Sequence, residues 1–289
     1  MKENALAEAI NILGRFCGKR DVEALNAASL RQAFGISRAD VMVLFGGSIL
    51  AGGDVLAQAI GDRIADNYVI VGGAGHTTDT LRNLVRREYP FIETAGLSEA
   101  AIFQEYLEKV HGCRADFLET KSTNCGNNIT YLLALLEENH VRCESIILCQ
   151  DATMQARMDA GMRKYVLAKD QADNAVQEAG TMPGRPAAFR LGQRMQIINF
   201  ASYAAAVRKD DTGLSFEKEI HGMWSMDRYI DLLMGEIPRL TDDALGYGPQ
   251  GKGFIAHVDI PDHVRQVFEL LKTVYGREIR WANPEYASH

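Results

Sequence analysis

The sequence has few cysteines, few prolines and no long apolar run, and each shortage excludes a class of protein. Its five cysteines are scattered without a Cys-x-x-Cys pair, so neither a disulfide framework nor a cysteine-based zinc site is expected. Seven prolines and 47% hydrophobic residues exclude collagen-like and disordered chains. No window of about 18 residues is continuously apolar and no secretory signal precedes the first helical pattern. We therefore expect a cytoplasmic protein without a membrane partner.

The sequence also has fewer basic than acidic residues and lacks the usual spacings of metal ligands. Lys and Arg number 31 against 38 Asp and Glu, a formal net charge of −7, so no nucleic-acid partner is expected. The histidines show neither His-x-His nor His-x-x-x-His spacing, so no metal site is predicted. The Gly-Lys-Ser/Thr of a P-loop and the Gly-x-Ser-x-Gly of a nucleophile elbow are both missing.

The pattern of apolar residues predicts the fold class. A chain of 289 residues suits about two domains, or one domain with appendages. Continuous apolar strands separated by helices are typical of a parallel sheet that is buried on both faces. The sequence therefore predicts an α/β fold, with a Rossmann-like, doubly wound, mostly parallel sheet over residues 36–204. Residues 1–35 and 205–289 are expected to form a helical N- and C-terminal cap.

The same periodicity predicts the individual elements. Strands are expected at 41–45, 68–71, 116–119, 145–149 and 195–200. Helices are expected at 54–65, from about 77, at 98–110, 124–139, 152–166, 216–234 and 261–274, with two more within residues 1–35. Residues 171–192 are rich in glycine, proline and polar side chains, which predicts a loop.

Glycines and polar residues follow the predicted strands at the ends where such sheets bind ligands. The carboxyl ends of parallel strands share one edge of the sheet. We therefore expect the segments around residues 46, 73, 122 and 151 to converge on a single crevice.

The strongest motif is the glycine-rich turn that runs into the helix starting near residue 77. Glycines allow a sharp turn and expose N–H groups, and a helix N-terminus favours a carboxylate or phosphate. A threonine can cap that helix or bind a ligand oxygen, and a neutral histidine can exchange one hydrogen bond with a ligand. A tight turn that binds nothing is the alternative. The candidate ligand-binding residues of this motif are Gly72, Gly73, Gly75, His76, Thr77 and Thr78.

Four further segments supply candidates for the same crevice. The glycines at 46–47 permit close approach of a flat or anionic ligand, and two asparagines four residues apart share one helix face. An acid at a strand end can bind a ribose hydroxyl or a cation. Ordinary turns and helix caps are the alternatives throughout. These candidates are Gly46, Gly47, Ser48, Glu99, Ser122, Asn124, Asn128, Gln150 and Asp151.

No catalytic residue is assigned. Cys125 lies near a predicted helix start, but no histidine or other base is adjacent to it in the sequence.

Several motifs together resemble the YdcF-like family, part of a wider group that includes the SanA and ElyC envelope proteins. The resemblance covers about residues 39–259. The motifs that carry it are Gly73-x-Gly75-His76-x-Thr78, Ser122-Thr123-Asn124-Cys125-Gly126-x-Asn128, Gln150-Asp151-x-Thr153-Met154-Gln155-x-Arg157, Gly222-x-Trp224-Ser225, Gly235-Glu236-x-Pro238-Arg239-Leu240-x-Asp242-Asp243 and Gly246-Tyr247-Gly248-Pro249-x-Gly251.

The resemblance implies a Rossmann-like domain that binds S-adenosylmethionine, without an established reaction. This chain departs from the wider group at Asn127, where a glutamate is usual, and at 151–154, where many relatives have Ser-x-x-His. The SanA and ElyC proteins also carry membrane anchors, which we do not expect here. Acid–base or metal chemistry that depends on those side chains is therefore not expected here.

The expected function is that of a cytosolic S-adenosylmethionine-binding protein, with methyl transfer to an unknown acceptor as the associated reaction. The glycine turn suits the ligand's carboxylate, and Asp151 or Glu99 suits its sulfonium or ribose diol. Trp224 or Tyr247 can face the cation or belong to the core. A hydrolase or transferase acting on a small phosphorylated or anionic metabolite, and a non-catalytic ligand sensor, are the alternatives. The oligomeric state is not predicted.

Overall fold

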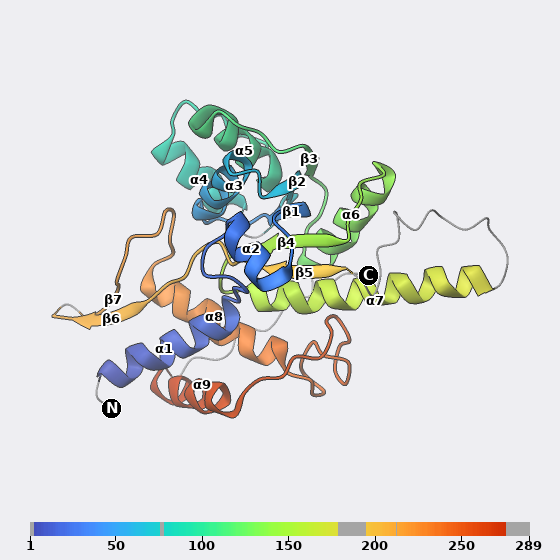
Figure 1. Ribbon diagram of the computed structural model, residues 1–289. Helices are drawn as coiled ribbons and strands as arrows, with labels where there is room; N and C mark the ends of the chain where they lie inside the picture. Colours follow the sequence, from blue (N-terminus) through green and yellow to red (C-terminus); the bar gives the residue numbers. More distant parts are fainter. Residues whose placement is uncertain (1–2, 76–77, 179–194, 212, 276–289) are drawn as a thin grey trace.

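A five-stranded parallel sheet is the centre of the fold (Figure 1). The computed structural model describes residues 3–75, 78–178, 195–211 and 213–275. The strand order is β3-β2-β1-β4-β5 and every pairing is parallel. The strands are β1 (Ala39–Phe45), β2 (Ala65–Val71), β3 (Phe117–Glu119), β4 (Ser145–Cys149) and β5 (Gln196–Asn199). This order confirms the predicted Rossmann-like α/β fold, because the connections reverse direction at β1.

Helices cover both faces of the sheet, so the fold is doubly wound. Alternate side chains of β1 enter different cores: Met42 and Leu44 join the core on one face, whereas Val43 and Phe45 join the core on the other. The first core is closed by α3 (Ala51–Gly61), α4 (Thr78–Glu88), α5 (Glu99–Tyr106) and the π-helical η1 (Leu107–His111). The second core is closed by α6 (Cys125–Glu138) and α7 (Gln155–Glu178).

The terminal parts of the chain build a third hydrophobic core. It contains α1 (Glu3–Cys17), α8 (Met226–Leu240), α9 (Asp262–Tyr275) and the antiparallel hairpin of β6 (Val207–Asp210) with β7 (Gly213–Phe216). Ile49, Ala152 and Tyr203 belong to the same core, and they follow β1, β4 and β5. This cap therefore packs against the carboxyl edge of the sheet, below which its helices group in Figure 1.

The first 35 residues are divided between two hydrophobic cores. Helix α1 packs with α8 and α9 in the cap. Val22, Leu25 and Leu30, the last from α2 (Ala27–Phe34), join the core between the sheet and α3 instead. No helix in the described part of the chain combines the length and apolarity that a bilayer crossing requires.

The predicted helix at 216–234 was wrong over its first ten residues. Phe216 ends strand β7, and α8 starts only after Ser225, whose Oγ accepts a hydrogen bond from the backbone N–H of Arg228 at 3.3 Å. Gly213, with a φ of 125°, allows the chain to reverse between β6 and β7. The predicted helix therefore begins ten residues late, because residue 216 ends the hairpin and residues 217–225 form a non-helical connection.

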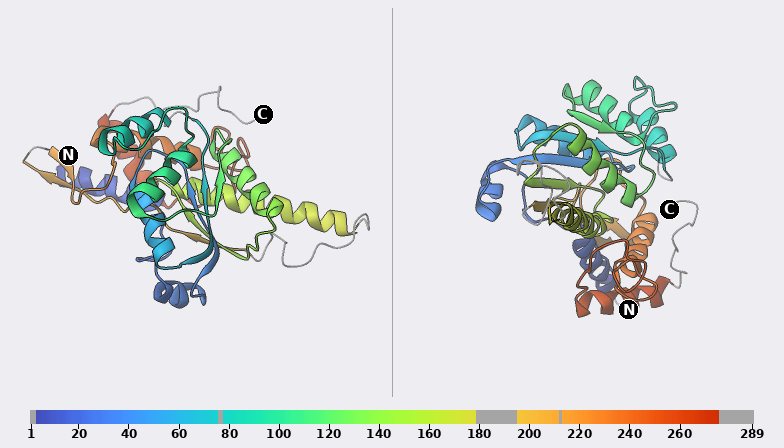
Figure 2. Two further views of the ribbon diagram at one scale, coloured as in Figure 1. Left: turned by 90° about the horizontal axis from the view of Figure 1, so that it is seen from above. Right: turned by 90° about the vertical axis from the view of Figure 1, so that its right-hand side faces the viewer.

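Two other boundaries differ from the prediction. Helix α3 ends at Gly61 rather than residue 65, since Arg63 adopts a φ of 54° and Ala65 already belongs to β2. Helix α7 continues past residue 166 to Glu178, which overlaps the expected loop at 171–192. The rest of that loop lies outside the described residues, and Figure 2 shows the end of α7 projecting beyond the sheet.

Close packing of α3 against α5 requires a glycine at residue 53. A Cβ atom there would lie 2.9 Å from Cδ1 of the buried Tyr106 ring, whereas a Cβ at Gly61 of the same helix would meet nothing within 4 Å. We expect Gly53→Ala to lower the free energy of unfolding by about 1–3 kcal/mol. Gly61→Ala should raise it by about 0.5 kcal/mol, because alanine is the better helix former. Urea unfolding of both variants checks this, and equal effects would contradict the packing argument.

Candidate functional site at the carboxyl edge of the sheet

The turns that follow the strands meet at one edge, as the sequence predicted. A Cβ atom on Gly46 would lie 3.2 Å from the Cα of Gly72, so the turns after β1 and β2 touch. The backbone N–H of Gly73 donates to the carbonyl of Ser122 at 3.0 Å, which joins the turns after β2 and β3. A Cβ on Gly47 would lie 3.6 Å from Oε1 of Gln150, the residue after β4.

The glycines of these turns allow the backbone of one turn to pack directly against the backbone of the next. A Cβ on Gly73 would lie 2.2 Å from the carbonyl oxygen of Ser122, so no other residue fits without moving the chain. The N–H groups of Gly46, Gly72 and Gly73 donate to backbone carbonyls, and that of Gly75 donates to Oγ1 of Thr78 at 2.7 Å. These four amides are therefore not available to an anion.

A buried carboxylate lies between the first two turns. Glu99 is the first residue of α5. Its Oε2 lies next to Gly46, where an added Cβ atom would be only 2.5 Å from that oxygen. Its Oε1 accepts a hydrogen bond from Oγ1 of Thr78 at 3.0 Å. The backbone N–H groups of Glu99 and Ala100 donate to the carbonyls of Gly73 and Gly72. Negative charge at this point attracts a cation or a hydroxyl donor and repels a phosphate.

Three serine hydroxyls at this edge have no hydrogen-bond partner in the described part of the chain. They belong to Ser48, Ser122 and Ser202, which are all buried, and each follows the last residue of a strand (β1, β3 and β5) by three positions. Leaving a buried hydroxyl unpaired costs about 1–3 kcal/mol, so such groups usually face a ligand or an ordered water. Their repetition along one edge is typical of a binding site.

The carboxylate of Asp151 is saturated by protein donors. Its Oδ1 accepts hydrogen bonds from the N–H and Oγ1 of Thr153 and from the hydroxyl of Tyr203, each at 2.8 Å. Its Oδ2 accepts from Nε1 of Trp224 at 3.0 Å. The preceding Gln150 accepts the N–H of Asp151 on its own Oε1 at 2.7 Å. Asp151 therefore anchors the cap to the sheet edge, and ligand binding by its carboxylate stays a prediction.

The N-terminus of α6 combines a helix cap with a positioned thiol. Asn124 caps the helix by accepting the N–H of Asn127 at 2.9 Å, and Asn128 lies half-buried in the next turn. Nη1 of Arg157 lies 3.1 Å from Sγ of Cys125. The same guanidinium donates from Nε to Oε2 of Glu236 at 2.6 Å and from Nη2 to Oε1 at 3.0 Å. Burial lowers the pKa of Arg157, but the electrostatic interactions with Cys125 and Glu236 outweigh burial and raise it overall.

Sequence reasoning missed that cation beside Cys125. Arg157 comes from α7 and Glu236 from α8, so no local spacing links either residue to the thiol. His76 and Thr77, which were predicted to bind a ligand at the start of α4, lie outside the described residues.

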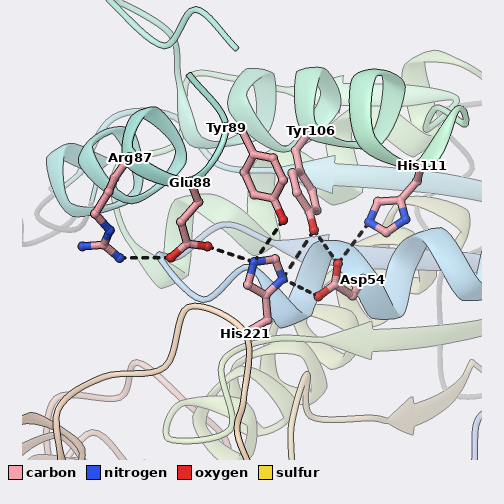
Figure 3. Close-up of polar contacts among 7 residues, drawn as sticks. All are labelled: Asp54, Arg87, Glu88, Tyr89, Tyr106, His111 and His221. Atoms are coloured by element: carbon pink, nitrogen blue, oxygen red, sulfur yellow. Dashed lines mark hydrogen bonds and ion pairs between the residues drawn. The ribbon is translucent and has the colours of Figure 1, made fainter. Parts of the chain in front are cut away.

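A second polar cluster lies beside the edge and centres on His221 (Figure 3). Nδ1 of His221 lies 2.7 Å from Oδ2 of Asp54, and its Nε2 lies 3.1 Å from Oε2 of Glu88. The hydroxyl of Tyr106 donates to Oδ1 of Asp54 at 2.5 Å, and Nε2 of His111 lies 3.0 Å from the same oxygen. Burial and the Asp54 carboxylate raise the pKa of Tyr106, which keeps its hydroxyl protonated as a donor.

This cluster fastens a segment of the cap rather than forming a catalytic dyad. With a carboxylate at each ring nitrogen, His221 has no nitrogen turned toward an incoming substrate. Its carbonyl accepts the N–H of Ala51 at 3.1 Å. Residues 217–225, which join β7 to α8 and which we call the strap, are thus held at His221 and again at Trp224.

Neither a metal cluster among the described residues nor a known protein family is found for this site. Within the residues described, no group of three or more His, Cys, Asp or Glu side chains is arranged to hold a metal ion. No protein-family model matches the chain.

Removing the His221 ring should loosen the strap. We expect His221→Gln to speed amide exchange at 217–225 by about 10- to 100-fold, because a charge-assisted hydrogen bond is lost. Hydrogen–deuterium exchange followed by mass spectrometry measures this. His263→Gln, at an exposed position on α9, is the matched control and should leave the strap unchanged. Unaltered exchange in His221→Gln would mean that Trp224 alone holds the strap.

His257 repeats the same arrangement on the surface of the cap. Its Nδ1 lies 2.6 Å from Oδ2 of Asp242 and its Nε2 lies 3.1 Å from Oδ1 of Asp259, and these hydrogen bonds raise its pKa above 6.5. Because the folded-state pKa is raised, the stabilisation is complete below about pH 6.5 and is lost as the pH rises through the folded value. An NMR titration should place the pKa above 6.5, and Asp242→Asn should lower it. A pKa that is unchanged in Asp242→Asn would contradict this pairing.

Proposed function

We propose that this protein belongs with the YdcF-like proteins and binds S-adenosylmethionine at the carboxyl edge of its parallel sheet. The sequence resemblance over residues 39–259 supports the ligand, and the Rossmann-like strand order supports the location, because ligands of such sheets bind at the edge where the strand order reverses. Gly46 and Gly47 follow β1 at that point and Gln150 follows β4.

The observation that carries the proposal is the buried Glu99 carboxylate beside Gly46, on a side chain whose Cβ packs against both Gly46 and Gly72. S-adenosylmethionine presents a sulfonium cation and a ribose diol, and both groups suit a buried carboxylate. A phosphorylated metabolite would need free N–H groups or cations here. The amides of Gly46, Gly72, Gly73 and Gly75 are already hydrogen-bonded, so this edge favours the cationic ligand.

The remaining polar groups of the ligand have suitable partners nearby. The unpaired hydroxyls of Ser48 and Ser122 can donate to its carboxylate or accept from its amino group. They follow β1 and β3, which are two strand spacings apart, or about 10 Å. Once bound, S-adenosylmethionine supplies an electrophilic methyl group, and release of S-adenosylhomocysteine would report methyl transfer to an acceptor.

Binding should depend on the charge of Glu99. We expect Glu99→Gln to weaken the affinity for S-adenosylmethionine by about 10- to 100-fold, the loss typical of one charge-assisted contact. Isothermal titration calorimetry measures the affinity. Glu105→Gln is the matched control: it lies on the same helix, where it pairs with Lys109 at 2.8 Å on the surface, and it should bind normally.

Two analogues separate the possible partners of Glu99. If the carboxylate faces the sulfonium, S-adenosylhomocysteine, which lacks that positive charge, should bind the wild-type protein more weakly than S-adenosylmethionine does. The Glu99→Gln variant should then bind the two ligands with equal affinity. If it faces the ribose diol, both ligands should weaken together. Binding of ATP without binding of S-adenosylmethionine would overturn the proposal and favour an enzyme acting on a phosphorylated metabolite.

A further inference from the structure

A separate cavity lies on the α3 side of the sheet, next to the end of β5. Its volume is about 260 Å³, and it shares no residue with the candidate site at the carboxyl edge. Three parts of the chain enclose it: the segment between α1 and α2, the middle of α3, and the residue after β5. The lining residues are Arg20, Ala24, Leu25, Val55, Gln58, Ala59 and Phe200.

The cavity holds a cation that has no carboxylate partner within the described residues. Nε of Arg20 donates to the carbonyl of Ala201 at 2.9 Å, and its Cζ lies 4.1 Å from the centroid of the Phe200 ring. These contacts hold the guanidinium plane in place and use one of its five N–H donors. Burial lowers the pKa of Arg20, and the electrostatic interaction with Cys149 only partly offsets this effect. The adjacent Lys19, by contrast, pairs with Asp159 at 3.0 Å.

Arg20 is half-buried in the cavity wall, whereas several arginines of the chain are paired with carboxylates. The protein carries a formal charge of −7, so carboxylates are plentiful, and many of its other arginines lie within 4.0 Å of one. A fixed guanidinium offers parallel N–H groups that match the two oxygens of a carboxylate. The rest of the wall is apolar at Leu25, Val55 and Ala59, with one amide at Gln58.

We propose that this cavity binds a small organic carboxylate, with the carboxylate group on Arg20 and a short apolar body against Leu25, Val55 and Ala59. One cation balances one carboxylate, whereas a phosphate dianion would need further donors that the apolar wall does not supply. The volume admits a body the size of one aromatic ring. The site is distinct from the proposed S-adenosylmethionine site, because its lining includes none of the residues assigned to that ligand.

Benzoate and its neutral analogue benzamide test the proposal, since they share one shape and differ in charge. We expect benzoate to bind the wild-type protein with a Kd on the order of 1 mM, and benzamide about tenfold more weakly. Ligand-observed NMR titration measures both. Arg20→Gln should weaken benzoate by about 10- to 100-fold and leave benzamide unchanged. Arg38→Gln, where an exposed arginine pairs with Asp66 at 2.7 Å, is the matched control and should bind benzoate normally.

A second variant keeps the test valid if Arg20→Gln fails to fold. Ala24 is an exposed residue of the wall, so Ala24→Leu narrows the cavity while retaining Arg20, and it should abolish binding of both ligands. Absence of benzoate binding to the wild-type protein, equal affinity for benzoate and benzamide, or normal binding to Ala24→Leu would overturn the proposal. None of these results bears on S-adenosylmethionine, whose affinity is measured with Glu99 variants.

Discussion

The contact of the Glu99 carboxylate with two glycine turns is the constraint on which the rest of the edge depends. A buried charge persists only where hydrogen bonds stabilise it, and Thr78 supplies one of them. Space for the carboxylate requires glycine at residue 46, because a Cβ atom there would overlap Oε2. The backbone of α5 is fixed at the same place by the carbonyls of Gly72 and Gly73. One side chain thus sets the spacing of two turns and one helix.

The cap and the sheet are joined by polar anchors in addition to their shared apolar core. Asp151, at the end of β4, holds Trp224, and Asp54, at the start of α3, holds His221. Both anchored residues lie on the strap, so two adjacent strands position one segment of the cap. Because the anchors are buried or half-buried and satisfied, the crevice has a rigid wall, which lowers the entropy lost on binding a ligand.

The hydrogen bonds already made by the glycine-rich turn change the kind of ligand that it can bind. A glycine-rich turn before a helix normally predicts an anion site, because its N–H groups are free. Here those amides are already hydrogen-bonded, and within the described residues the buried hydroxyls without a partner are those of Ser48, Ser122 and Ser202, with the Glu99 carboxylate at the same edge. The edge is therefore suited to a cationic or hydroxyl-bearing ligand. A cation without a carboxylate partner among the described residues is Arg20, which lines a separate cavity beside α3.

The sequence by itself determined the parallel sheet and the gathering of the turns at one edge, because strands that are apolar on both faces must be covered by helices on both sides. It did not determine the hairpin at 207–216, whose strands of four residues are too short to show a period. Nor could it reveal the His221 cluster, since Asp54, Glu88 and His221 come from three distant segments. Which amides remain free was also decided only by tertiary contacts, because a hydrogen bond between two turns depends on how the strands stack side by side rather than on either turn alone.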